Sequence, residues 1–424
     1  MTAAGGRVRP WRAVGPGLVF ALTVVGPGDL VANVAAGASH GYGLLWVLPV
    51  ALAFRFVWLS TSARYVLVTG ETLVAGFARY GRWSLWLTLG SLVVIRHMSN
   101  LTKVLLMGGA AHALLPLPTP YSMSIWGAGF ALAAYAFMAR GGYGPVERLC
   151  KVLAVAFGVS LVAAAVAARP SAGDVLQGLF VPSAPADVGL YSTLLLVTAL
   201  IGTESGSLTN ITYSYFVIEK GWRGAGDLRA QRFDLAIGVG ALLVAAVVLQ
   251  AAAAATLHGT ATSVESVDDL SRLLSTTFGR AGVLVFAAGL LGKTFAGFVG
   301  GTTGYALLAG DIVGRLGREP EAAATAAVDR RHDRTYQSWL AILALSPLYV
   351  VFTSWQPVIL ALLASAAMAG LIPLLAVGLL VLGNDERLGP HANRWPANLL
   401  IVLLAIIAIA LTGANALRFL GIGS

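Results

Sequence analysis

The chain has 424 residues, of which 57% are hydrophobic and only 11% are charged, and its mean hydropathy is +0.80. This profile excludes a soluble globular domain and predicts a polytopic membrane protein. The single cysteine, Cys150, excludes a disulfide framework and any multi-cysteine metal centre. The net charge of +9 fits basic loops on one side of a membrane, so we expect no nucleic-acid partner.

Eleven apolar stretches follow one another along the chain, each a candidate for a helical membrane crossing. They cover residues 14–41, 43–67, 85–114, 122–139, 147–168, 189–217, 233–256, 281–309, 336–353, 357–382 and 396–417. The series predicts an all-α membrane protein in which residues 1–424 form a single transmembrane domain.

The Lys and Arg residues between these stretches predict the orientation of the chain. If Arg7, Arg9 and Arg12 are cytoplasmic, most basic loop residues fall on the same side. The opposite side receives only Arg169, Arg272, Arg280 and Arg418. Because basic loops stay inside, we predict a cytoplasmic N-terminus and an extracytoplasmic C-terminus. The predicted location is the lipid bilayer of a bacterial inner (plasma) membrane.

The first stretch is interrupted at its centre by VVGPGDLVAN, residues 24–33. Proline lacks an N–H group and glycine exposes the backbone, so Gly26, Pro27 and Gly28 should break the helix. Asp29 comes directly after this break and is costly to bury in a bilayer. A carboxylate beside a broken helix indicates binding, although Asp29 is also a favoured cap for the helix that follows.

The sixth stretch has a similar polar centre around Glu204, with Gly202, Ser205 and Gly206 beside it. Among the Asp and Glu residues, only Asp29 and Glu204 lie near the middle of a span. Corresponding breaks in two halves are typical of transporters built from inverted repeats, whose half-helix ends form a binding site at the membrane midplane. We therefore predict that helices 1 and 6 are unwound, at residues 26–28 and 204–206, and that they bind a solute there.

Several basic residues also lie inside the apolar stretches. Arg55 and Lys293 are expected to line cavities or to pair with polar backbone groups. Lys103 lies near the middle of the third stretch, and we expect it to form an ion pair, either structural or connected with transport. His97 on the same stretch is a candidate for proton handling, with a structural position as the alternative.

The stretch GPGDLVANVAAGASHGYGLLWV resembles the first helix of the Nramp metal transporters, whose signature there is Asp-Pro-Gly-Asn. The segments SARYVLVTGETL, GGTTGYALLAGDIVGRLG and LLASAAMAGLIPLLAVGLLVLGND resemble the end of that family's second helix, its eighth helix and its tenth helix. The resemblance implies the LeuT-like fold. Two inverted five-helix repeats would cover about residues 14–168 and 189–382, and an additional helix would cover about 396–417.

The resemblance does not extend to the family's metal site. The family's metal-binding aspartate corresponds to Gly26 and its asparagine to Asp29, whereas its Met-Pro-His motif corresponds to Gly206, Ser207 and Leu208. Its tenth-helix glutamine falls near Ala366, and its third-helix acids, usually given a role in proton movement, fall on Asn100 and Lys103. Because thioether sulfur favours softer metals, its loss predicts that Mn²⁺ is not preferred over Mg²⁺.

Two hypotheses for the function follow. In the first, Asp29 and Glu204 bind a hard cation such as Mg²⁺, together with oxygen donors from the broken helices. The further residues of this site are Gly26, Asn33, Thr203, Gly206, Thr209 and Asn210. In the second, Lys103 pairs with Asp29 or Glu204, and the site takes a small organic or anionic solute and no metal.

Structural explanations exist for part of this set. Asn33, Thr209 and Asn210 can serve as hydrogen-bonding contacts between helices, and Gly206 can be small for packing. The sequence has no nucleotide-binding motif and no cluster of nucleophile and base, so we expect neither an enzyme nor a bound cofactor. The expected partners are the bilayer and a small solute or metal ion.

Overall fold

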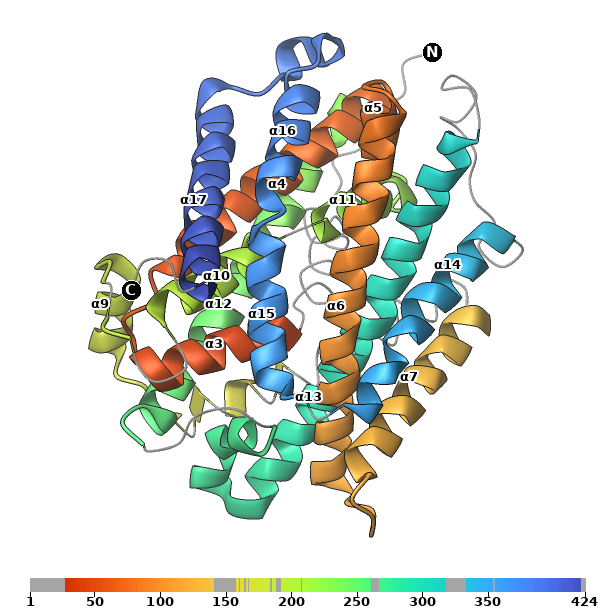
Figure 1. The fold of residues 1–424 in the computed structure, drawn as a ribbon. Coiled ribbons are helices and arrows are strands. Elements are labelled where there is room, and N and C mark those ends of the chain that lie inside the picture. Colours follow the sequence, from red (N-terminus) through yellow and green to blue (C-terminus); the bar gives the residue numbers. More distant parts are fainter. Residues whose placement is uncertain are drawn as a thin grey trace.

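The structure, a computed structural model, describes residues 27–140, 158–183 apart from 160, 164 and 167, 185–187, 192–206, 208–260, 267–317, 333–353 and 355–420. All elements in these ranges are helices (Figure 1). Gly26, Ser207 and most of the predicted stretch 147–168 lie outside the described residues.

The first half of the described chain contains helices at most of the predicted positions. In chain order they are α3 (Pro27–His40), α4 (Val47–Thr69), α5 (Leu73–Ala78), α6 (Arg82–Leu114), α7 (Ser122–Arg140), α9 (Ala172–Phe180), α10 (Thr193–Glu204) and α11 (Thr209–Glu219). The boundaries of α6 and α7 lie within a few residues of the predicted 85–114 and 122–139.

The second half continues the series. Its helices are α12 (Leu228–Leu257), α13 (Val267–Leu316), α14 (Arg334–Leu345), α15 (Pro357–Ala369), α16 (Ile372–Gly383) and α17 (Trp395–Phe419). The 3₁₀ helices in the described ranges are η1 (Ala225–Asp227), η3 (Ser346–Phe352) and η4 (Glu386–His391).

Six described helical stretches are long and apolar enough to cross a membrane by themselves: 122–140, 225–257, 279–316, 334–352, 357–383 and 395–419. The predicted crossings 14–41, 43–67, 85–114 and 189–217 are not among these six, and their described helices carry buried charge or a break. Helix α4 contains the buried Arg55 and Arg64, and α6 contains the buried Arg96 and Lys103. Helices α3, α10 and α11 are short.

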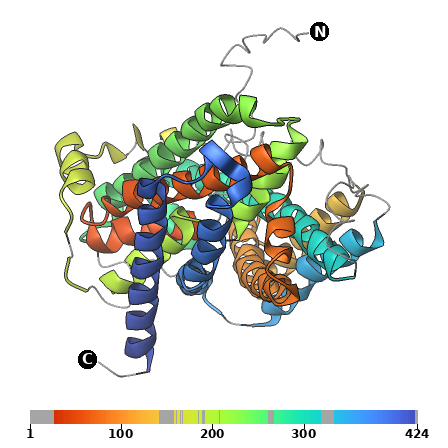
Figure 2. The same cartoon turned by 90° about the horizontal axis from the view of Figure 1, so that it is seen from above.

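Helices α6, α7, α13 and α14 lie side by side at one side of the molecule (Figure 1). Figure 2 shows the molecule from above, in a view nearly along the axis of α6. Helix α3 packs against α10, α12 and α15, and α17 packs on the outside against α16 and α10. Helix α15 contacts both groups, through α6 on one side and α10 on the other. The polar cavity described below lies where these groups meet.

The predicted break in the sixth stretch is confirmed. Helix α10 ends at Glu204, α11 begins at Thr209, and Gly206 has a φ of +83°. Asn210 Nδ2 donates a hydrogen bond to the freed carbonyl of Ser205 at 3.1 Å. A side chain at position 206 would meet the Asn210 amide at 2.4 Å. Gly206 and Asn210 together therefore stabilise the break between α10 and α11.

Two further interruptions were not predicted. The stretch 357–382 is divided into α15 and α16 at Gly370 and Leu371, and Pro373 in the first turn of α16 has no N–H to continue the helix. Helix α13 turns at Gly279, whose φ is +55° and ψ is −137°. The strong apolar character of the stretch 357–382 conceals its break in the sequence, whereas Gly279 lies just before the predicted stretch 281–309.

Candidate functional site

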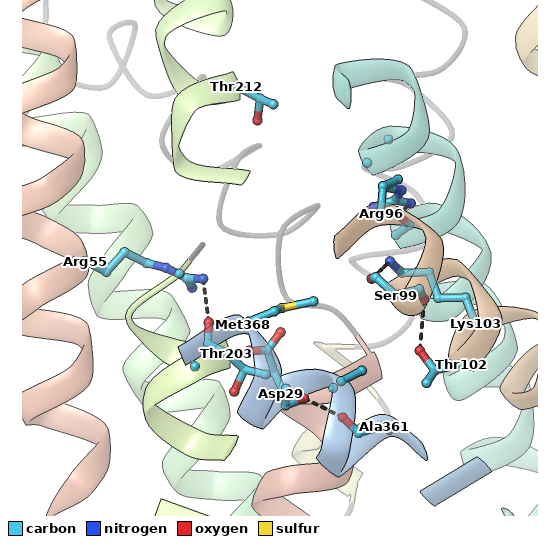
Figure 3. Close-up of a pocket in the computed structure, with 18 of the residues that line it drawn as sticks. Asp29, Arg55, Arg96, Ser99, Thr102, Lys103, Thr203, Thr212, Ala361 and Met368 are labelled. Carbon is cyan, nitrogen blue, oxygen red and sulfur yellow. Dashed lines mark hydrogen bonds between the residues drawn. The ribbon is translucent and has the colours of Figure 1, made fainter. Parts of the chain in front are cut away.

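A polar cavity lies among α3, α4, α6, α10, α11, α13 and α15, with an empty volume of about 750 Å³ that includes the part open to solvent. Its polar and charged lining consists of Asp29, Arg55, Arg96, Ser99, Thr102, Lys103, Thr203, Thr212 and Ser365, with Met368 beside them. In Figure 3, Arg55 and Lys103 lie on opposite sides, with Asp29 and Met368 between them.

Asp29 lies in the first turn of α3 and is only 5% exposed. The N-terminus of a helix stabilises a carboxylate, because the helix dipole is positive there. Gly28 allows this turn to approach its neighbours closely: a Cβ at that position would be 2.6 Å from Ser365 Oγ and 3.2 Å from Thr203 Cγ2. Gly28 therefore lets the start of α3 bring Asp29 against α10 and α15. Pro27 and Gly28 are helical residues of α3, so the predicted unwinding at 26–28 is wrong for these two positions.

Glu204 and Asn33 line a second, smaller pocket, which Asp29 also borders. Asn33 Nδ2 donates to Glu204 Oε1 and to the Asp29 carbonyl, both at 2.8 Å. The two predicted acids are thus brought near each other, but Glu204 is not part of the main cavity lining. Asp29 is the residue common to both spaces.

Arg55 enters the cavity from α4 and is 2% exposed. Its Nη2 donates to the carbonyl of Thr203 at 2.8 Å, one residue before the end of α10 (Figure 3). Asp29 and Glu204 are its negatively charged neighbours. The expectation that Arg55 lines a cavity or pairs with backbone is met on both counts, and its positive charge lies near both acids.

Helix α6 contributes one wall of the cavity, which consists of the basic residues Arg96 and Lys103 and of Ser99 between them. Arg96 Nη2 donates to the carbonyls of Gly297 and Phe298 and to Thr302 Oγ1, each at 3.1 Å. Lys103 Nζ donates to Ser99 Oγ at 2.6 Å. In the part of the chain that the structure describes, Lys103 forms no ion pair with an acid, contrary to the sequence expectation.

The two residues predicted to act with Lys103 lie away from the cavity lining. Asn100 Nδ2 donates to Thr302 Oγ1 at 3.2 Å and to the Leu343 carbonyl at 2.8 Å, so it connects α6 with α13 and α14. The His97 ring is 3.0 Å from Ser346 Oγ and 3.2 Å from the Tyr349 hydroxyl. Both therefore have structural contacts at helix interfaces.

Some of the remaining predicted residues line the cavity, and others have structural contacts. Thr203 and Gly206 line the cavity, whereas Asn210 stabilises the helix break. Thr209 begins α11, but its side chain is not among those described, and Gly26 lies just before the described residues.

Sequence matching missed Met368 and Ser365, which α15 places on the cavity. The expectation of a site without sulfur rested on positions in helix 6, whereas this thioether comes from a different helix and projects toward the cavity centre (Figure 3). Their spacing of three residues on one helix face, just before the break at Gly370, is the signal that could have indicated them.

The described residues contain no group of three or more His, Cys, Asp or Glu side chains able to hold a metal ion. A cation in the cavity would therefore have one carboxylate, Asp29, together with neutral donors.

Known proteins match this chain along nearly its whole length. The family model described as natural resistance-associated macrophage protein-like (Nramp) matches residues 17–418. The divalent metal cation transporter MntH of Erwinia tasmaniensis is 25% identical over 410 residues, which cover 94% of this chain and 92% of that protein.

Solved structures show the same architecture. A manganese transporter of Eremococcus coleocola superposes with a TM-score of 0.76 at 15% identity, covering 97% of this chain and 87% of that one. MhsT in complex with L-phenylalanine superposes with a TM-score of 0.58 at 14% identity, covering 95% of this chain and 97% of that one. The LeuT-like fold, an all-α membrane architecture of inverted repeats, is thereby confirmed. With the family model matched over residues 17–418, this chain belongs to the Nramp family of membrane transporters.

Proposed function

We propose that this protein is a secondary transporter that carries divalent metal cations across the membrane by alternating access. The observation that carries the proposal is the position of Asp29, a buried carboxylate at the start of α3 that borders both the main cavity and the smaller pocket. The MntH of Erwinia tasmaniensis and the transporter of Eremococcus coleocola are named as divalent metal and manganese transporters, which supports the same class of cargo.

Asp29 supplies the charge in the proposed binding event. Its carboxylate would hold the cation while Thr203 and Ser365 offer neutral oxygens from α10 and α15. Asn33 links the Glu204 carboxylate to the backbone of Asp29 and so couples the end of α10 to the start of α3. Movement of these two half-helices relative to α15 would expose the bound ion to one side of the membrane or the other.

The preference for Mg²⁺ expected from the sequence does not form part of this proposal. That expectation required a site without sulfur, and Met368 lines the cavity. A thioether beside a carboxylate suits Mn²⁺ and Cd²⁺ better than Mg²⁺, because the softer metals accept sulfur ligands. We therefore propose divalent transition metals as the cargo.

A second candidate is supported by the three basic residues on the same cavity, Arg55, Arg96 and Lys103. In this alternative the transporter carries a small organic or anionic solute in place of a metal. The two candidates differ in what the loss of Asp29 should do, because an anionic cargo gains nothing from a nearby carboxylate.

The test is uptake of Mn²⁺, Cd²⁺ and Mg²⁺ into proteoliposomes by wild type and by Asp29→Asn, which keeps the shape of the side chain and removes its charge. Uptake should fall by about tenfold or more, as expected for loss of a charged contact. Asp174→Asn, the same change at an exposed residue of α9, should leave uptake unchanged. Metal uptake by Asp29→Asn at the wild-type rate would refute the proposal.

A further inference from the structure

The face of α6 that lines the cavity carries buried positive charge. The acidic residues nearby are too few to neutralise it. Arg96, Ser99 and Lys103 are three and four residues apart, so they share one face of the helix. Arg96 is 4% exposed and Lys103 is 3% exposed. Among the described residues that line the cavity, Asp29 is the only acid, and Arg55 already lies beside it.

The neighbours of these two cations do not neutralise them. The hydrogen-bond acceptors around Arg96 are two backbone carbonyls and a hydroxyl, which satisfy N–H groups but carry no net charge. The charged neighbours of Lys103 are Arg96, Asp29 and Lys293, and two of these three are positive. Burial disfavours the charged forms of such side chains, and an anion bound here would stabilise those charged forms.

Some hydrogen-bond donors on this α6 wall have no acceptor among the described residues. The Lys103 ammonium has three N–H groups and gives one to Ser99, and the structure records no other acceptor for it in the described chain. Arg96 Nε is buried and has no hydrogen-bond partner among the described residues. Oxyanions accept such charged donors in short, strong hydrogen bonds.

The packing of neighbouring residues also fixes the position of the Arg96 guanidinium group. A Cβ on Gly301 of α13 would be 2.2 Å from Arg96 Nη1, so glycine at this position makes room for the guanidinium. The centroid of the Tyr305 ring lies 5.4 Å from Arg96 Cζ. Arg96 is therefore held in place before any ligand arrives, which lowers the entropic cost of binding one.

We propose that this wall is a binding site for a small oxyanion, of the carboxylate, bicarbonate or phosphate class, held by Lys103 and Arg96 with Ser99. The site goes beyond the proposed metal transport: it lies on the side of the cavity opposite Arg55 and needs no metal to form. An oxyanion at α6 would reduce the net positive charge of the lining, in which Arg55, Arg96 and Lys103 face the single acid Asp29.

Calorimetric titration of the purified full-length protein tests this inference. The probes are the sodium salts of acetate, bicarbonate and phosphate, with chloride at equal ionic strength as the reference. Metal is removed with a chelating resin, because soluble chelators are themselves carboxylates. At least one oxyanion should bind saturably, and the oxyanion that binds most tightly identifies the class of ligand.

Three variants locate the site. Lys103→Met should weaken oxyanion binding by about tenfold or more, the effect of losing one charge-assisted hydrogen bond. Lys103→Arg should retain binding, because it restores the charge. Lys220→Met, at an exposed lysine after α11, is the matched control and should bind like wild type. If Lys103→Met does not fold, Ser99→Ala replaces it, since it removes the hydroxyl beside Lys103 and should also weaken binding.

Two results would overturn the inference: no oxyanion binding above the chloride reference in wild type, or unchanged affinity in the Lys103 and Ser99 variants. Because the titration contains no metal, either result leaves the proposed metal transport standing. Conversely, oxyanion binding without any metal uptake would contradict the metal proposal alone.

Discussion

At the scale of single residues, Met368 is the side chain that changes the expected metal preference. It lines the cavity from α15 and is the only sulfur among the described lining residues. Its replacement by leucine keeps a similar volume and removes the thioether. The residue therefore separates the contribution of sulfur from that of packing.

We expect Met368→Leu to lower the ratio of Cd²⁺ or Mn²⁺ uptake to Mg²⁺ uptake by about tenfold, which corresponds to about 1.4 kcal/mol. The measurement is uptake of each ion into proteoliposomes under competition. Met123→Leu, the same change at a residue of α7 that is 46% exposed, should not alter the ratio. An unchanged ratio in Met368→Leu would show that the thioether takes no part in selection.

The sequence was informative about which residues are buried and polar, and less so about their surroundings. Asp29, Thr203 and Lys103 stood out as polar groups in apolar spans, and all three line the cavity. Asn100 stood out for the same reason, yet it joins α6 to α13 and α14. A polar side chain in a span can face a cavity or a neighbouring helix, and spacing along one helix does not distinguish the two.

At the scale of helices, the break between α10 and α11 positions the cavity lining. Gly206 has a φ of +83°, which L side chains adopt at a cost of about 1–3 kcal/mol. A methyl group there would also displace Asn210. The break thus depends on one backbone conformation and one side-chain contact.

Gly206→Ala should therefore lower the melting temperature of the purified protein and strongly reduce uptake. The matched control is Gly221→Ala after α11: its φ of +81° imposes a similar strain, but nothing lies within 4 Å of its added Cβ. The control should lose stability by the strain alone and retain uptake. Equal uptake in the two variants would mean that the geometry of the break is not needed for transport.

The breaks also show where prediction from sequence succeeds. The sixth stretch combines glycine with Ser, Thr and Glu, so its interruption at residues 204–206 is visible from composition. The interruption at Gly370 and Leu371 lies in a strongly apolar segment, where only Pro373 marks it. Arg55 meets α10 across 148 residues of sequence, a contact that only the tertiary fold creates.

At the scale of the whole molecule, the orientation in the membrane remains a prediction from the basic loops. Single cysteines in a Cys150→Ser background test it with a membrane-impermeant maleimide applied to intact cells. Leu420→Cys should be labelled from outside, and Arg223→Cys should be labelled only after the cells are opened. Both residues are exposed, so protection of either one reports its side of the membrane. The reverse pattern would invert the predicted topology.

The central claim is that the cavity around Asp29 binds a divalent metal cation. Anomalous diffraction from crystals grown with Mn²⁺ tests it most directly, because the signal locates the metal without reference to transport. We predict a peak in contact with the Asp29 carboxylate, on the cavity that Met368 lines, and its loss in Asp29→Asn. A wild-type protein that takes up Mn²⁺ but shows its metal peak elsewhere, or shows none in this cavity, would contradict the account.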